Sequence, residues 1–341
     1  MKPAGRRNRG VTLVELMIGA ALLGILALAM APVYQASQRA FTSLEARTSL
    51  KSQGQDAVNK VGHRLSECKR MFENNANDNA FLARVQLGTA PAVMAGSVLP
   101  VSEETGSISP SSAAFVAASV GNQLFFASVL AAGDFNVLDS SANTKTVRID
   151  EYWFNRYYIA FDTASKSVGG NTRRVLWEWH SRTYADYNQI MAISDTTKRN
   201  NTVTALVNAG IAYAWDPSTT TVTAAFYTLA VGGAVATQSG HTILMGNSGT
   251  CRDMLKLTTG LTVGGFRYGV SPNTGGGFST AYLVPQFAVA SVNFPSGFEV
   301  VDIGPNSARQ IFIRLVLVAE GPFPGPIGSE QVLLTDTRDL W

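Results

Sequence analysis

The chain of 341 residues has little cysteine, little histidine and little charge. Two cysteines exclude a disulfide-dense small scaffold and every zinc site built on four thiolates. No two of the three histidines, His63, His180 and His241, lie within a metal-motif spacing of each other. HExxH, CxxC, phosphate-loop and calcium-loop signatures are also missing. The sequence therefore predicts no metal, no cofactor, no catalytic residue and no small-molecule substrate, and it argues against an enzyme.

Charge of one sign is concentrated at the amino terminus. Four of the 27 basic residues lie within residues 1–10, and the other 23 are nearly balanced by 24 acidic residues. The net charge of +3 therefore gives no general argument for nucleic-acid binding. Two short basic pairs, Arg173 with Arg174 and Lys198 with Arg199, are more typical of a solvated surface. Nucleic-acid binding stays an open question at this stage.

Residues 11–31 form the one long apolar run of the sequence, interrupted by Glu15 and Thr12 alone. A helix of this length would measure about 32 Å, close to the roughly 30 Å hydrocarbon core of a bilayer. The basic segment 1–10 should remain in the cytoplasm, so the rest of the chain should be exported. Residues 11–31 are therefore predicted to span the membrane.

Glu15 decides between three interpretations of this run. A cleaved secretory signal and a plain signal anchor both explain a basic start followed by an apolar stretch. Neither explains Glu15, because a carboxylate costs about 2.5–3.5 kcal/mol at the middle of a bilayer. A signal could be cleaved after Ala27-Leu28-Ala29 or after Ala29-Met30-Ala31, and Pro32 directly after the second option disfavours cleavage there. An acidic residue in such surroundings indicates a function.

The segment Gly10-Val11-Thr12-Leu13-Val14-Glu15 resembles the processing site of type IV prepilins and type II secretion pseudopilins. The resemblance implies that a membrane-embedded prepilin peptidase cuts between Gly10 and Val11 and then N-methylates Val11, where the family usually has Phe. It also implies a role for Glu15, which would attract the amino-terminal charge of a neighbouring subunit during assembly. A carboxylate and an ammonium attract strongly at low dielectric, and each relieves the burial of the other.

Gly24 and Pro32 also fit this resemblance, since family members commonly carry a helix-weakening Gly and a helix kink at these places. Proline removes a backbone donor and collides with the preceding turn, so the sequence predicts a bend near residues 28–32.

An amphipathic pattern follows the apolar run. Steps of three and four residues predict one helix over residues 11–72, with its second half packed against a sheet; an independent coiled coil is the alternative. Its inward stripe consists of Val58, Val61, Leu65, Cys68 and Phe72.

The remainder, residues 73–341, is expected to be a head of strands and loops without a second long helix. Two antiparallel hairpins are predicted, 155–162 with 174–180 and 308–320 with 331–337, joined by turns at 165–171 and 321–328. The alternation in the second hairpin predicts one face formed by Ile311, Ile313, Leu315 and Leu317. A further strand with a Gly bulge is expected at 260–270. Residues 80–145 and 181–250 are interpreted as insertions or variable loops. The predicted fold class is α+β, a long N-terminal helix packed on an antiparallel β-rich head.

The order of these strands is similar to that of minor pilins of the PilW kind and of J-type minor pseudopilins. The resemblance implies a minor pilin that helps prime assembly of a type IV pilus and lies at or near its tip. Its partners would be prepilin peptidase, other minor and major pilins, and the inner-membrane assembly platform. The prepilin would sit in the bacterial inner membrane with a periplasmic head, and later in the pilus at the cell surface. A J-type pseudopilin of a type II secretion system and an adhesive or DNA-capturing tip pilin are alternatives, and a role in twitching motility, DNA uptake or adhesion stays open.

Cys68 and Cys251 would meet an oxidising compartment if the head is exported, and two cysteines can pair there. A disulfide between them would stabilise the fold by about 2–5 kcal/mol. Two separate thiols are the alternative, because the sequence does not show whether the two Cα atoms come within about 7 Å.

Overall fold

The computed structural model describes residues 11–102, 120–161, 174–246, 254–256, 297–304, 309–320 and 326–336. Its helices are α1 (Leu13–Ser66), α2 (Ala76–Leu82), α3 (Tyr187–Met191), α4 (Thr196–Asn208) and the single 3₁₀ turn η1 (Val222–Ala224). Its strands are β1 (Cys68–Met71), β2 (Val85–Gln86), β3 (Leu124–Leu138), β4 (Thr144–Phe161), β5 (Arg174–His180), β6 (Tyr184–Asp186), β7 (Tyr213–Trp215), β8 (Phe226–Leu229), β9 (Val235–Thr237), β10 (Ile243–Leu244), β11 (Met254–Lys256), β12 (Phe298–Ile303), β13 (Gln310–Glu320) and β14 (Pro326–Asp336).

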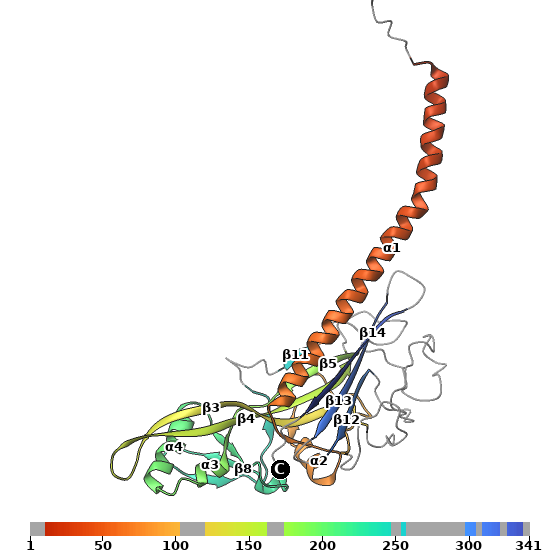
Figure 1. Cartoon of the computed structure of the whole chain (residues 1–341). Coiled ribbons are helices and arrows are strands. Elements are labelled where there is room, and N and C mark those ends of the chain that lie inside the picture. Colours follow the sequence, from red (N-terminus) through yellow and green to blue (C-terminus); the bar gives the residue numbers. More distant parts are fainter. Residues whose placement is uncertain are drawn as a thin grey trace, which may run out of the picture.

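Helix α1 dominates the shape of the molecule. Its first half rises freely from a β-rich head, and only its last turns lie on that head (Figure 1). The most apolar 18-residue window of α1 has a mean hydropathy of 2.4, and none of its residues is buried. Among the described residues, α1 is the one helix long and apolar enough to cross a membrane. The predicted α+β architecture is confirmed.

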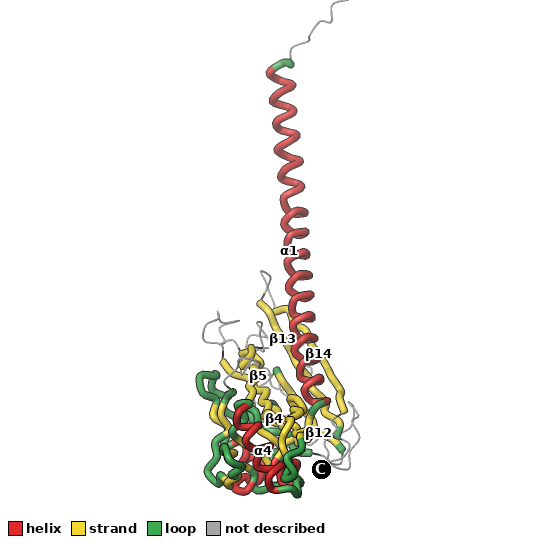
Figure 2. The backbone as a smooth tube through the Cα atoms, turned by 90° about the vertical axis from the view of Figure 1, so that its left-hand side faces the viewer, coloured by secondary structure: helices red, strands yellow, loops and turns green. Residues whose placement is uncertain are grey.

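The second half of α1 packs on the head as a helix on a sheet. Its buried residues, Leu50, Ala57, Val58, Val61 and Leu65, are at most 3% exposed and face β13 and β14. Figure 2 shows β13 and β14 beside the lower part of α1. The structure therefore favours packing against a sheet over an independent coiled coil.

The predicted end of this helix was wrong. Helix α1 ends at Ser66 and not at residue 72, and the N–H of Glu67 caps it on the carbonyl groups of Arg64 and Leu65. Residues 68–71 instead form β1, which pairs antiparallel with β3 and places Cys68 opposite Ser128. The spacing of the apolar residues does not reveal this change from helix to strand. The backbone of residues 68–71 bonds to β3, yet the side chains of Cys68 and Phe72 are buried as a continued helix would also predict.

The larger sheet has nine strands. Its main order is β1-β3-β4-β6-β7-β8-β9, and β4 also pairs with β5, which pairs with β11. Strand β4 is long enough to serve two partners, because residues 155–161 pair with β5 while Glu151 and Tyr152 pair with β6. The β3–β4 hairpin extends away from α1, with α3, α4 and β8 along one side (Figure 1).

A smaller antiparallel sheet, β12-β13-β14, lies under α1. It is joined to the segment before β3 by two backbone bonds between Gly121 and Val300. Both predicted hairpins pair as expected, β4 with β5 and β13 with β14. Strand β14 starts at Pro326, inside the predicted loop 321–328, so the sequence overestimated that connection.

Among the described residues, four apolar cores hold these layers together, and the smallest contains Val120, Val301, Ile303 and Phe312. The first lies between α1, the smaller sheet and one face of the larger sheet, and it contains the predicted stripe of Ile311, Ile313, Leu315 and Leu317. The second is aromatic and fills the other face, where Phe154 contacts Phe72, Phe125 and Trp215. The third fixes α3 and α4 to the far end of the β3–β4 hairpin.

The interpretation of residues 80–145 and 181–250 as variable loops was wrong. The first stretch contains β3, one of the two longest strands, and the second contains α4, a helix capped by Asp195 and buried at Val203 and Leu206. Helix α4 and the second half of β3 each have one face toward solvent, which explains their small and polar residues. The predicted turn at 165–171 and the predicted strand at 260–270 lie outside the described residues.

Candidate assembly site on the N-terminal helix

The first turn of α1 is organised by Thr12 and Glu15. Thr12 has extended backbone angles and occupies the N-cap, where its hydroxyl oxygen accepts a bond from the N–H of Glu15 at 3.3 Å. In return, the carboxylate of Glu15 accepts bonds from the backbone N–H of Thr12 at 2.9 Å and from its hydroxyl at 3.0 Å. This reciprocal pattern is a capping box, which satisfies two backbone donors that a helix start leaves without partners.

The capping box gives Glu15 a local role that the sequence analysis missed. The signal was present, because Thr followed three residues later by Glu before an apolar run is a known helix-start pattern. The negative side chain also lies at the positive end of the helix dipole. Within a single subunit the carboxylate is thus already engaged by its own helix, with its side chain exposed on the outside.

The side chains around Glu15 are apolar and exposed. Val11 and Leu13 are 73% and 75% exposed, and the large apolar side chains from there to Tyr34 are exposed in the same way. A continuous apolar surface of this length marks a membrane or protein interaction site. The segment can be buried by lipid or by other helices, and the structure therefore places Glu15 where a neighbouring chain can reach it.

Gly24 and Pro32 lie within the continuous helix. Apart from the backbone of its own helix, no atom lies within 4 Å of where a Cβ of Gly24 would be, so this glycine lies on an exposed part of the helix surface. Helix α1 continues unbroken through Pro32, and Figure 1 shows its upper part at an angle to its lower part. The local bend near residues 28–32 stays a prediction.

The described residues include only one member of the predicted cysteine pair. Cys68 is 3% exposed at the start of β1, whereas Cys251 lies outside the described residues.

The predicted cleavage site lies at the boundary of the described residues. Gly10 lies outside them, and Val11 is the first of them.

A buried polar cluster couples α1 to the larger sheet. Tyr157 Oη donates to Glu178 Oε1 at 2.7 Å, His180 Nε2 lies 3.2 Å from the same oxygen, and Lys60 Nζ of α1 binds Glu178 Oε2. Burial by itself would raise the pKa of Glu178, but the hydrogen bonds from His180, Lys60 and Tyr157 lower it to about 2. Glu178 is fully buried, so this cluster has a structural role and holds α1 on the larger sheet.

The comparison with known families agrees with the geometry of the first turns. Residues 5–31 match the family model of the prokaryotic N-terminal methylation motif. The chain has a prepilin-type N-terminus. The matched residues include Gly10, Val11 and Glu15, and the motif supports a protein of the pilin or pseudopilin type. No match was found among curated proteins or among solved structures. The prepilin resemblance is thus confirmed for the motif, and the likeness to the PilW kind stays a prediction.

Proposed function

We propose that this prepilin-type chain is a minor pilin of a type IV pilus, which helps prime assembly and lies at or near the tip. Prepilin peptidase would cut between Gly10 and Val11 and methylate Val11. The inner-membrane assembly platform would then transfer α1 from the bilayer into a bundle with other minor and major pilins. In this proposal the protein has no enzymatic activity of its own.

The bare first half of α1 is the observation that carries the proposal. Its apolar side chains are exposed all round, so the helix suits lipid before assembly and neighbouring helices afterwards. Glu15 is the exception, and its cost in lipid is relieved if it meets the amine of a neighbouring Val11. That exchange would replace the bonds that Thr12 supplies within the subunit.

The size of the head supports a minor rather than a major subunit. About four fifths of the chain follows α1. Copies of such a head would crowd one another in a fibre of many identical subunits, whereas a tip position offers free space. The basic segment 1–10 supports a cytoplasmic amino terminus and a periplasmic head in the prepilin.

Mass spectrometry of the protein from cells tests the processing. We expect a mature chain that lacks residues 1–10 and carries one methyl group on Val11. An intact leader, or a chain that begins at Met30 or Pro32, contradicts the proposal.

Glu15→Gln tests the assembly role, because glutamine can keep the capping box while the charge is removed. We expect loss of the protein from sheared fibres and normal levels in the membrane. Asp56→Asn, the same loss of a carboxylate charge at an exposed site on the part of α1 that packs on the head, is the matched control and should be incorporated normally. Unchanged incorporation of Glu15→Gln would show that the charge is dispensable.

A J-type pseudopilin of a type II secretion system is the second candidate, since the same motif serves both systems. Deletion separates the two, because loss of piliation with intact secretion supports the pilin and the opposite result supports the pseudopilin. A gel-shift assay with the full chain in detergent tests the alternative of a DNA-capturing tip protein.

A further inference from the structure

Strand β3 has an unused edge. Strand β1 covers only its first part, opposite residues 126–128, and one more bond runs from Val129 N–H to the carbonyl of Glu67. From residue 130 to residue 138, β4 is the sole strand partner of β3 among the described residues. About half of the backbone donors and acceptors of these nine residues therefore point away from the sheet.

The edge of β3 is protected only in part. Natural edge strands are blocked by lysine, by proline, by a bulge, by their short length or by a covering helix. Helix α4 packs against β3, and its Asn201 already occupies the carbonyl of Leu138 at the end of the edge. Residues 130–138 read LAAGDFNVL, with neither lysine nor proline and with Asp134 as the single charge. The shift in register between Val129 and Ala131 lies at the start of the edge and leaves the rest regular.

The edge is also rigid. Val137 and Phe135 point into the core that contains α4, while Asp134, Asn136 and Leu138 are exposed on the opposite face. The end of the hairpin is tied to α4 by a bond from Asn201 Nδ2 to the carbonyl of Leu138 at 2.9 Å. An incoming strand would therefore meet a preformed ladder and would not have to order it.

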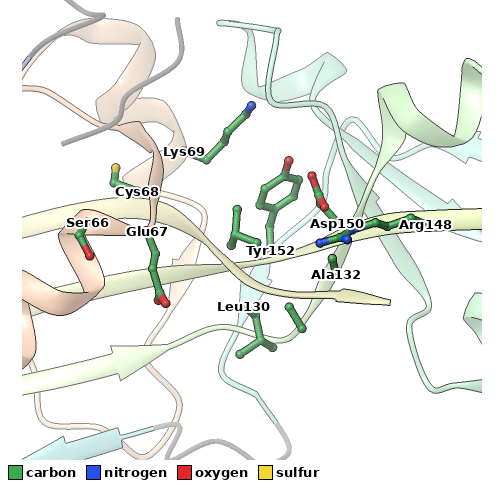
Figure 3. Close-up of a pocket in the computed structure, with 11 residues that line it drawn as sticks. Ser66, Glu67, Cys68, Lys69, Leu130, Ala132, Arg148, Asp150 and Tyr152 are labelled. Carbon is green, nitrogen blue, oxygen red and sulfur yellow. The ribbon is translucent and has the colours of Figure 1, made fainter. Parts of the chain in front are cut away.

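A pocket of about 400 Å³ opens at the first residues of β1, beside the start of the free edge of β3. Figure 3 shows side chains of Glu67 and Lys69 on one side and of Leu130, Arg148 and Tyr152 on the other. Val129, Leu130, Ala131 and Ala132 form its apolar part, which suits one apolar side chain next to the row of backbone groups. The charged side chains of Glu67, Lys69, Arg148 and Asp150 also line it. A pocket beside an open strand edge is the arrangement by which strand addition combines affinity with specificity.

We propose that the edge of β3 at residues 130–138 binds an extended segment of a different fibre subunit by strand addition. The segment places an apolar side chain in the pocket and a basic side chain opposite Asp134. This inference rests on the proposed function for the existence of such a partner. The charge of Asp134 argues against a second copy of this chain, because antiparallel pairing with full overlap would put two Asp134 side chains face to face.

Photo-crosslinking in assembled fibres tests the proposal on the full chain. A photoreactive amino acid is placed at 136 in one strain and at 138 in another, two neighbouring positions on the exposed face of β3. We expect crosslinks to one segment of another subunit, displaced by two residues between the strains, as strand pairing requires. The same amino acid in place of Ala236, exposed on the outer strand β9, is the control and should not crosslink to that segment.

Asp134→Lys adds a test of the charge and should lower the crosslink yield about two- to fivefold, as expected for a cross-strand ion pair. Crosslinks without the two-residue displacement, crosslinks to β3 of a second copy, or none above the control overturn the proposal. If crosslinking fails while Glu15→Gln still abolishes incorporation, strand addition alone is wrong. If wild-type protein is absent from fibres, the proposed function itself is wrong.

Discussion

Gly54 offers a direct test of how α1 is held on the head. This glycine is buried where the helix crosses β13 and β14. A Cβ at position 54 would lie 2.6 Å from Cγ of Gln331 and 3.3 Å from Cδ1 of Leu317. The first distance is below any normal contact, and both neighbours are buried, at 9% and 0% exposure. Gly54→Ala should therefore push the helix away from the sheet or displace these side chains.

Two opposing effects set the magnitude. Alanine stabilises a helix interior by about 1 kcal/mol relative to glycine. Overpacking of a filled core costs about 1–3 kcal/mol. The net effect of Gly54→Ala should be a loss of about 0–2 kcal/mol in the free energy of unfolding. The cost of the close contact with Gln331 can be measured separately by removing the Gln331 side chain. Gln331→Ala deletes the Cγ atom, so the double variant should recover most of the overpacking cost.

Thermal unfolding of the full chain in detergent, followed by near-UV circular dichroism, measures these changes as a shift of Tm by about 2–4 °C per kcal/mol. Gly62→Ala is the matched comparison, because its Cβ would meet only Cδ2 of Leu333, the end of a flexible, partly buried side chain, at 2.6 Å. That variant should be neutral or slightly stabilised. Equal stabilisation by both substitutions, with no coupling between Gly54→Ala and Gln331→Ala, would refute the close-contact argument.

Three further predictions concern buried titratable groups and thiols. Glu178 has a folded pKa of about 2 against an ordinary value of 4.5, so its interactions stabilise the fold above about pH 4.5 and are lost as the pH falls toward 2; Glu178→Gln should flatten the acid limb of Tm against pH. Burial raises the pKa of Glu299 to about 8 although Arg314 opposes this, so the folded state keeps a proton that the unfolded state releases; stability should decline between about pH 4.5 and 8, and Glu299→Gln should remove that decline. If Cys68 and Cys251 pair, alkylation should add mass only after reduction, and equal masses with and without reduction would contradict the pairing.

The sequence predicted the parts of the fold whose patterns are strong and local. The uninterrupted apolar run predicted the exposed first half of α1, and the strict alternation of Ile311, Ile313, Leu315 and Leu317 predicted the buried face of β13. The candidate site was also within reach, since its motif is contiguous from Gly10 to Glu15. The role of Thr12 in holding Glu15 was readable from the same residues but depends on backbone geometry at the first turn.

The central part of the head could not be predicted, for two physical reasons. Strand β3 is buried on both faces near its start and on one face near its end, so its sequence has no single periodicity. Helix α4 carries Asn, Thr and Lys on its outer side, buries little more than Thr202, Val203 and Leu206, and is capped at its start by Asp195. In both elements the burial pattern follows from a neighbour far away in the chain, which a single sequence does not reveal.

The stretch of α1 between the apolar run and the head carries large apolar side chains that the subunit itself leaves exposed. Phe41 and Leu44 are 70% and 63% exposed, beyond the predicted span of residues 11–31 and before the first fully buried residue of α1, Leu50. The subunit's own head does not cover them, and they lie outside the predicted membrane span, although burial of each would contribute about 1.5–3 kcal/mol. In the proposed fibre the helix or head of another subunit would cover them, so we expect Phe41→Ser to weaken incorporation into fibres without changing the Tm of the isolated chain. A fall in Tm of the same size as the loss of incorporation would instead show that Phe41 contacts its own head.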